Sequence, residues 1–195
     1  MPSLSRPLTL TDVALPRAGA LQNALLIVAA SLLTAAASQL ALRLPWTPVP
    51  ITGQTFAVLL AGAVLGARRG FLALSLYLAE GAAGLPVFAG GTGGAAALLA
   101  PSGGYLIAFP LAAWLTGFLA ERGWDRHALS TFAAMLLGSG VIFALGLAQL
   151  SRFVPPSTLI ASGLAPFVIG DLLKCAVAAG LCPAAWRLAG GPEAR

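Results

Sequence analysis

Asp171 and Lys174 are the residues whose types and spacing most clearly suggest chemistry. Both lie in the apolar run "PFVIGDLLKCAVAAG", residues 166–180. Residues three apart in a helix share one face, about 4.5 Å apart along the axis. A charge at the centre of a bilayer costs at least ~2.5 kcal/mol, so it is rarely without a role. The two residues form either a structural ion pair or, as we favour, the polar end of a ligand site, with Asp171 as the acceptor and Lys174 as the donor.

The elements that must position this pair are membrane helices. Of the 195 residues, 58% are hydrophobic and only 9% are charged, whereas soluble domains contain about 25% charged residues. We predict an all-α integral membrane protein, a bundle of six transmembrane helices. The six segments are 21–43, 54–66, 70–84, 103–120, 128–150 and 166–188. The second and third are shorter than the ~20 residues of a full span, which indicates backbone that lines a cavity.

The basic residues predict the orientation of this bundle, because membrane proteins place most Lys and Arg on the cytoplasmic side. With both termini cytoplasmic, eight of the eleven basic residues lie inside, namely Arg6, Arg17, Arg68, Arg69, Arg122, Arg126, Arg187 and Arg195. Arg43 and Arg152 lie outside, and Lys174 is within a span. We therefore expect a multi-pass protein of the cell (inner) membrane, with cytoplasmic tails at 1–20 and 189–195 and a membrane domain at 21–188.

The charged pair is expected near the outer surface. Ser162 and Gly163 interrupt the helical pattern, and Pro166 suits the first turn of a new helix. Asp171 then lies about 8 Å below that start. The outer loops 43–53, 85–104 and 151–164 are rich in Pro, Gly or hydroxyl residues, and long loops of this kind usually cover a site. The sequence therefore predicts a site that opens outward.

Polar and aromatic residues near those loops are candidate walls of the site. The segment "AGGTGG" either brings peptide N–H groups to a ligand or packs tightly, and it lacks the Lys-Ser/Thr of a phosphate loop. Trp46, Tyr77 and Tyr105 are interfacial aromatics or pocket walls, and Glu80 faces either the cavity or the outer interface. The candidate ligand-binding residues are Asp171, Lys174, Thr52, Gln54, Tyr77, Gly90, Gly91, Thr92, Gly93 and Tyr105.

Enzymatic and metal-dependent functions are disfavoured. The motifs HExxH and GxSxG are absent, and His127 is the only histidine. Cys175 and Cys182 lie about 10 Å apart along one helix, which is too far for a mutual disulfide. The chain also has no ATPase motif. We expect neither an enzyme nor a bound metal or cofactor, so any transport is passive or powered by other subunits.

Small residues recur at a four-residue spacing in the first segment. Ala29, Ala37 and Ala41 form one row, and Ala30, Thr34 and Ser38 form the next. Such rows permit close helix contact in lipid. They serve either packing within the bundle or docking of a partner.

Four stretches in fixed order, "PVPITGQTFAVLLAGAVLG", "LYLAEGAAGLPVFAGGTGG", "LLAPSGGYLIAF" and "GDLLK", closely resemble the BioY family. These proteins are the biotin-binding S components of energy-coupling-factor (ECF) transporters, and the resemblance covers about residues 21–188. It implies a six-helix substrate-capture subunit with both termini inside and a site open to the outside. It also implies partners: a transmembrane coupling (T) subunit, which the alanine-rich face of the first helix meets, and two cytosolic ATPase subunits that use the ATP.

Biotin, the substrate that this resemblance implies, suits the candidate residues. Asp171 would accept hydrogen bonds from the ureido N–H groups, while Lys174 would donate to the ureido carbonyl or offset the charge of Asp171. The biotin carboxylate would meet N–H groups of the "GGTGG" loop or Lys174, because Arg43 and Arg152 are expected only at the rim. The alternatives are an S component for another small vitamin and a non-transport scaffold protein in which Asp171–Lys174 is a structural ion pair.

Overall fold

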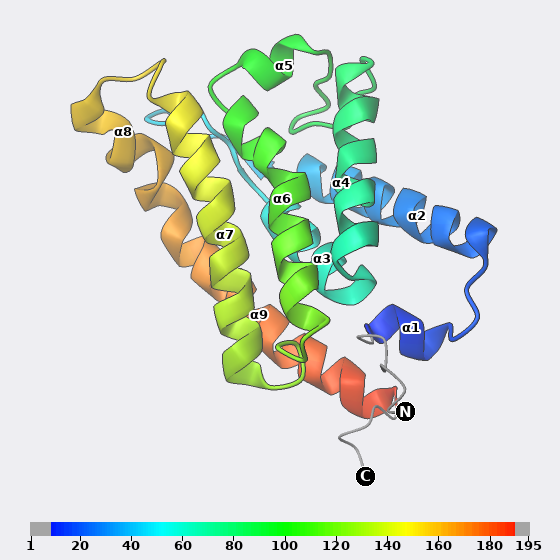
Figure 1. The fold of residues 1–195 in the computed structure, drawn as a ribbon. Coiled ribbons are helices and arrows are strands. Elements are labelled where there is room, and N and C mark those ends of the chain that lie inside the picture. Colours follow the sequence, from blue (N-terminus) through cyan, green and yellow to red (C-terminus); the bar gives the residue numbers. More distant parts are fainter. Residues whose placement is uncertain (1–8, 190–195) are drawn as a thin grey trace.

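The computed structural model describes residues 9–189, and this part of the chain is mostly helical (Figure 1). Arg6 and Arg195, predicted to be cytoplasmic, lie outside the described residues. The helices are α1 (Leu10–Ala14), α2 (Ala20–Gln39), α3 (Gln54–Leu65), α4 (Ala67–Ala82), α5 (Ala96–Leu99), α6 (Gly103–Ala120), α7 (Ala128–Leu150), α8 (Pro156–Gly163) and α9 (Ala165–Leu188). The strands β1 (Ala41–Leu42) and β2 (Ile51–Thr52) pair antiparallel.

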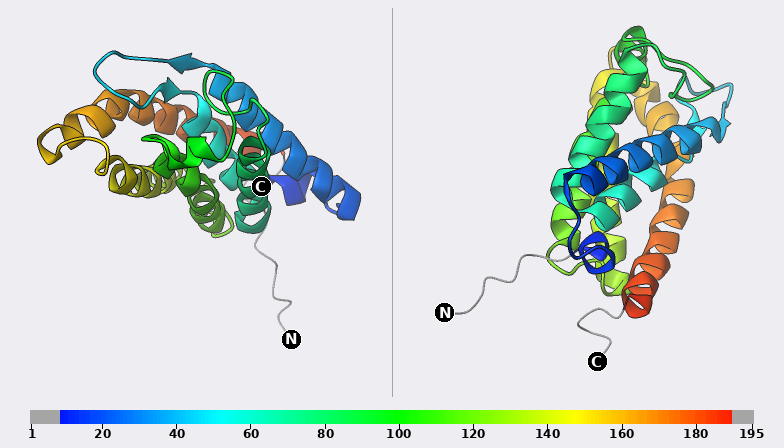
Figure 2. Two further views of the ribbon diagram at one scale, coloured as in Figure 1. Left: turned by 90° about the horizontal axis from the view of Figure 1, so that it is seen from above. Right: turned by 90° about the vertical axis from the view of Figure 1, so that its right-hand side faces the viewer.

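The helix α6 is the centre of the bundle. It packs against α3, α4 and α7, and most of its residues are buried. Small residues permit these close contacts: a Cβ at Gly117 would collide with the backbone of Ala67 at the start of α4. In Figures 1 and 2, α4, α6 and α7 run along the bundle, whereas α2 crosses α4 at a steep angle.

Each of the six predicted segments corresponds to a helix. The bounds of α6 and α7 match the prediction, and α3 and α9 differ from it by one residue at one end. α2 ends at Gln39 because the chain then turns into β1. By length and hydropathy, α2, α6, α7 and the stretch Pro156–Leu188 are able to cross a membrane. α3 and α4, with 12 and 16 residues, are short, as predicted.

Two helix breaks set the ends of the bundle. Gly66, between α3 and α4, has a φ of +86°, which residues with a Cβ rarely adopt. The second break separates α8 from α9 at Leu164, and Pro166 lies in the first turn of α9. An interruption was predicted at Ser162–Gly163, but these two residues end α8, and the break lies one residue later, at Leu164. The short helix α8 before it was not predicted, because eight residues are too few to show a helical pattern.

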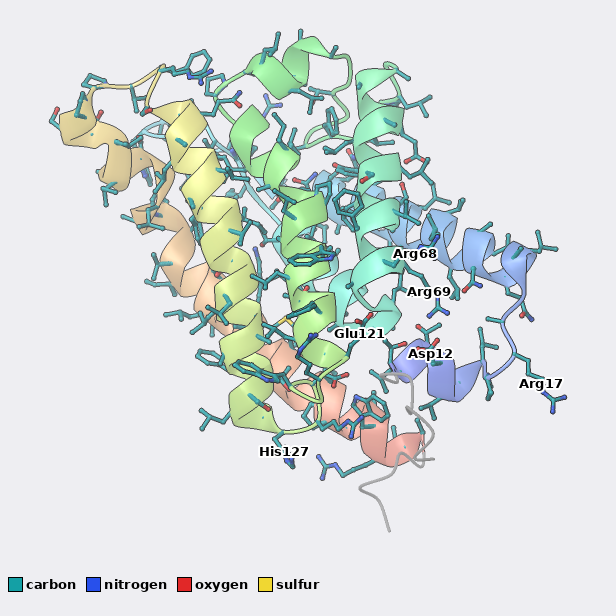
Figure 3. All side chains as sticks on the ribbon, viewed as in Figure 1. Asp12, Arg17, Arg68, Arg69, Glu121 and His127 are labelled. Carbon is teal, nitrogen blue, oxygen red and sulfur yellow. The ribbon has the colours of Figure 1, made fainter. Side chains whose placement is uncertain are left out.

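A further short helix, α1, packs on the end of α3 and was also not predicted. Thr9 and Asp12 form a capping box at its start, and the Thr11 hydroxyl donates to the Val64 carbonyl at 2.7 Å. Arg69 pairs with Asp12 at 2.8 Å (Figure 3). Burial alone would raise the pKa of Asp12, but hydrogen bonds from Arg69 and Thr9 outweigh it and hold this pKa below its ordinary value of 3.8.

Candidate ligand-binding site

A cavity of about 380 Å³ lies where the starts of α3, α6 and α9 meet the second half of α7. The β1–β2 connection and the loop after α4 complete its wall. Its volume suits a small organic ligand. The large apolar residues of the wall are Phe88, Leu106, Phe109, Ile142, Phe143 and Phe167. The charged and main polar residues are Arg43, Thr52, Gln54, Thr55, Asp171 and Lys174.

Asp171 and Lys174 both line this cavity, but they do not pair with each other. In the described part of the chain no ion pair joins them. The Lys174 Nζ instead donates to the Thr52 carbonyl at 2.7 Å and to Thr55 Oγ1 at 2.8 Å. The interpretation of the two as a closed structural ion pair is therefore wrong for this structure. The two residues do not pair because the long lysine side chain reaches the start of α3, where two acceptors lie within hydrogen-bond distance.

Asp171 sits on the inner face of α9 and is only 6% exposed. One turn further along, Cys175 Sγ lies 4.0 Å from the hydroxyl of Ser139 on α7. Cys175 and Cys182 are both free thiols, in line with the predicted lack of a disulfide. Because a buried carboxylate is stabilised by hydrogen-bond donors, a ligand that supplies N–H groups would add to the hydrogen bond that Asp171 receives from Ser139. The cavity thus offers a strong acceptor and a strong donor from adjacent turns of one helix.

Thr52 and Gln54 line the cavity at the start of α3. The Thr52 hydroxyl donates to Gln54 Oε1 at 3.1 Å. Gln54 Nε2 donates to the Tyr77 hydroxyl, which donates to the Val87 carbonyl at 2.9 Å. Tyr77 is fully buried and lies outside the set of residues that line the cavity in the described structure. Tyr77, a candidate wall residue or interfacial aromatic, therefore lies one layer behind the wall.

Tyr105 lines the cavity, but its hydroxyl is used by the protein. It donates to the Gly163 carbonyl at 2.7 Å, and the Thr47 hydroxyl donates to the Ser162 carbonyl at 2.6 Å. These bonds satisfy two carbonyls at the end of α8, where helical partners are missing. Tyr105 and Thr47 therefore hold the helix break from which Asp171 is positioned.

The glycine-rich loop contributes less to the wall than predicted. Thr92 lines the cavity, whereas Gly90, Gly91 and Gly93 lie outside the lining in the described structure. Gly90 and Gly91 adopt φ values of +69° and +70° in a turn that Phe88 N–H and the Thr92 carbonyl close at 2.9 Å. A Cβ at Gly93 would collide with the preceding backbone. Gly90 and Gly91 thus serve the turn, and Gly93 serves tight packing, which was the alternative interpretation of this segment.

Arg43 lines the cavity and is exposed, so it lies at the rim, as expected from the sequence. It directly follows β1, and a Cβ at Gly90 would meet its guanidinium. The pairing of β1 with β2 folds this segment back toward the cavity. Two-residue strands in a proline-rich segment leave no sequence pattern, so this pairing could not be predicted. Arg43 gives the cavity a second cation, suited to an anionic group.

The polar and small residues of α2 are divided between the bundle and its surroundings. The Ser31 hydroxyl donates to Glu80 Oε2 at 2.5 Å, so Glu80 faces α2 and not the cavity. One predicted row, Ala30, Thr34 and Ser38, is buried within the bundle. In the other row Ala29 is exposed, and Ala37 and Ala41 are partly exposed. Only this second row remains available to a partner in the structure.

The fold and the cavity define a helical membrane protein that binds a small solute. Several of its helices are long and apolar enough to cross a bilayer, and the described residues contain no group of three or more His, Cys, Asp or Glu that could hold a metal. The model of the BioY family matches residues 8–191. The chain therefore belongs to the BioY family, and the resemblance seen in its sequence is confirmed.

Individual relatives agree with this assignment. The probable biotin transporter BioY of Pyrococcus horikoshii is 45% identical over 131 residues, 67% of this chain and 76% of that protein. The biotin transporter BioY of Thermotoga maritima is 43% identical over 140 residues, 71% and 81% of the two chains. A 2.1 Å crystal structure of the S-component for biotin from an ECF-type ABC transporter matches with a TM-score of 0.79 and 29% identity, covering 89% of this chain and 95% of that one.

Proposed function

We propose that this chain is the biotin-capturing S component of an ECF-type importer and takes biotin from the outer face of the membrane. The observation that carries the proposal is one cavity with a buried Asp171, a half-buried Lys174 and an aromatic wall. The chain's relatives are named as biotin transporters. The BioY family consists of transporters and not of enzymes, which agrees with the prediction that the chain is not an enzyme.

In this proposal the ureido ring of biotin binds at Asp171 and Lys174. Asp171 accepts a hydrogen bond from a ureido N–H group. Lys174 donates a hydrogen bond to the ureido carbonyl with part of the N–H groups that otherwise bond to Thr52 and Thr55. The aromatic wall covers the apolar part of the ligand. A solute without the ureido group leaves these buried polar groups unpaired, so it is rejected.

The carboxylate of biotin is placed at Arg43. This arginine lines the cavity and is exposed. It can therefore bind an anion while the guanidinium and the anion both remain partly hydrated. A guanidinium binds a carboxylate through two parallel hydrogen bonds. The peptide N–H groups of the glycine loop, one of the two options left open by the sequence, are less suitable because those glycines lie outside the cavity wall.

The membrane orientation follows from the same geometry. All six long segments cross or enter the cell (inner) membrane, with both termini cytoplasmic. Arg43 lies at the cavity and Arg152 directly follows α7, whereas Arg68 and Arg69 lie in the first turn of α4, at the opposite end (Figure 3). This distribution follows the rule that cytoplasmic loops collect basic residues. The cavity then opens to the outside.

The partners of the chain are a coupling (T) subunit and two cytosolic ATPase subunits. The chain itself binds no cofactor, and the ATP is used by those partners. The surface offered to the coupling subunit is the exposed side of α2, with Ala29 and the partly exposed Ala37, together with the partly exposed Ala41 of β1. Small residues there allow close helix approach.

The test of this proposal is a titration of the detergent-purified protein with biotin, riboflavin and thiamine. Saturable binding of biotin alone is expected. Tight binding of riboflavin or thiamine instead would select an S component for another vitamin. Binding of none of the three would favour the scaffold alternative, which the missing Asp171–Lys174 ion pair already weakens.

A single substitution then tests the site. Asp171→Asn removes the acceptor charge and should weaken biotin binding about 5- to 150-fold, the equivalent of ~1–3 kcal/mol for an unsatisfied buried group. Asp12→Asn makes the same chemical change at the far end of α3 and should leave biotin affinity unchanged. If both variants bind biotin like the wild type, the ureido group does not bind at Asp171.

A further inference from the structure

Tyr77 stands at the centre of a hydrogen-bond chain behind the cavity. It is fully buried, with its ring edge-on to Phe88 at 5.5 Å and stacked on Phe109 at 6.4 Å. A tyrosine hydroxyl has one proton. The Val87 carbonyl can only accept, and it lies 2.9 Å from this hydroxyl. The Tyr77 hydroxyl donates to Val87, and its oxygen accepts a hydrogen bond from Gln54 Nε2.

The Val87 carbonyl is itself held in place from a second helix. The Ser38 hydroxyl on α2 lies 2.7 Å from it and 2.6 Å from the Ala35 carbonyl, and its single proton is shared between these two acceptors. Gln39 Nε2 in turn donates to the Ser38 hydroxyl at 2.7 Å. Ser38 of α2 and Tyr77 of α4 therefore both lie against the Val87 carbonyl, which ties the two helices together at this point.

This direction of hydrogen bonding determines how the Gln54 amide lies. The amide has donors at one end and an acceptor at the other. Since Tyr77 accepts, the Nε2 end points to Tyr77, behind the cavity wall. Oε1 then points to Thr52, which lines the cavity and donates to it at 3.1 Å. An amide oxygen has two lone pairs, so one remains for a ligand.

We propose that Tyr77 is a positioning residue for ligand recognition, locking the Gln54 amide so that its oxygen accepts a hydrogen bond from the bound solute. The inference rests on the proposed function, with biotin as the solute. Ionised biotin has only its two ureido N–H groups as donors, so Asp171 and Gln54 each accept one. Lys174 serves the ureido carbonyl, and its contact with Thr52 brings it close to Gln54.

The test compares three ligands on Tyr77→Phe, which removes the hydroxyl and keeps the ring contacts. The ligands are biotin and the two analogues that carry a methyl group on one or the other ureido nitrogen. The wild type should bind biotin and reject both analogues. The variant should bind biotin about 5- to 30-fold more weakly. It should also lose discrimination against one analogue while still rejecting the analogue whose methyl group meets Asp171.

Gln54→Met is a second variant that tests the same step. Because Tyr77 acts through Gln54, the double variant Tyr77→Phe/Gln54→Met should bind biotin no more weakly than Gln54→Met alone. Thr116→Val is the matched control, since it removes a buried hydroxyl whose bonds stay within α6. Its affinity for biotin should equal that of the wild type.

Three results would overturn the inference. In the first, Tyr77→Phe binds all three ligands like the wild type. In the second, it weakens the binding of all three ligands by one common factor. In the third, the double variant loses biotin affinity by the product of the losses measured for Tyr77→Phe and Gln54→Met alone. In each of these cases the wild type still binds biotin, so the proposed function is not affected. A wild type that does not bind biotin refutes the proposed function and this inference together.

Discussion

Lys174→Met is the substitution that most sharply separates a ligand role from a structural role of this lysine. The ammonium donates to Thr52 and Thr55 at 2.7 and 2.8 Å, so it joins α9 to the start of α3. Methionine keeps a side chain of similar length without donors. The change therefore removes the hydrogen bonds and the charge while it preserves most of the packing.

The expected magnitudes differ for stability and for binding. A hydrogen bond to a charged group contributes about 1.5–3 kcal/mol, but removal of the half-buried ammonium also relieves its desolvation. The two effects oppose each other, so the free energy of unfolding should fall by only about 1–2 kcal/mol. Biotin instead loses the donor to its ureido carbonyl, which should weaken binding about 10- to 150-fold.

The assay measures the dissociation constant for biotin by calorimetry and the melting temperature of the ligand-free protein in the same detergent. Lys174→Gln retains an N–H donor without the charge, so its affinity should lie between those of the wild type and Lys174→Met. If Lys174→Met binds biotin within twofold of the wild type while its melting temperature falls, Lys174 only clamps the two helices. That result would refute its role at the ureido group.

The remaining predictions concern three other parts of the molecule. Arg43→Gln should weaken the binding of biotin about tenfold, because one charge-assisted contact with the carboxylate is lost. The binding of biotin methyl ester, measured in a competition assay, should be unaffected. Gly81→Ala should lower both stability, by about 1–3 kcal/mol, and biotin affinity, because its Cβ collides with the Phe88 ring in the cavity wall. Gly140→Ala, with nothing near its Cβ, should raise the melting temperature and keep the affinity. The pKa of Asp12 lies below its ordinary 3.8, so α1 should be fully stabilised above that pH and lose this contribution as the pH falls through the folded-state pKa. Hydrogen exchange of residues 10–14 should show this pH dependence in the wild type and not in Asp12→Asn.

Local signals made much of the fold predictable from the sequence. α6 and α7 are apolar throughout and flanked by Gly, Ser or charged residues, so their bounds could be predicted to the residue. The start of α9 could be predicted because proline is well suited to the first turn of a helix, where Pro166 lies. The approximate depth of Asp171 followed from this start.

The parts that could not be predicted depend on contacts between distant segments. Lys174 bonds to Thr52 and Thr55, more than a hundred residues away, and no spacing rule gives that pairing. Arg43 reaches the cavity through a hairpin too short to leave a sequence pattern. Tyr77 is a tyrosine in an apolar run, and a pocket wall and a buried relay have the same sequence signature. In each case tertiary packing decided where the side chain points.

The measurement that tests the central claim most directly is a crystal structure of the protein with biotin. The account predicts biotin inside the cavity, with its ureido nitrogens within hydrogen-bond distance of Asp171 and Gln54, its ureido oxygen at Lys174 and its carboxylate at Arg43. Biotin bound outside this cavity, or inside it with the ureido ring away from Asp171 and Lys174, would contradict the account.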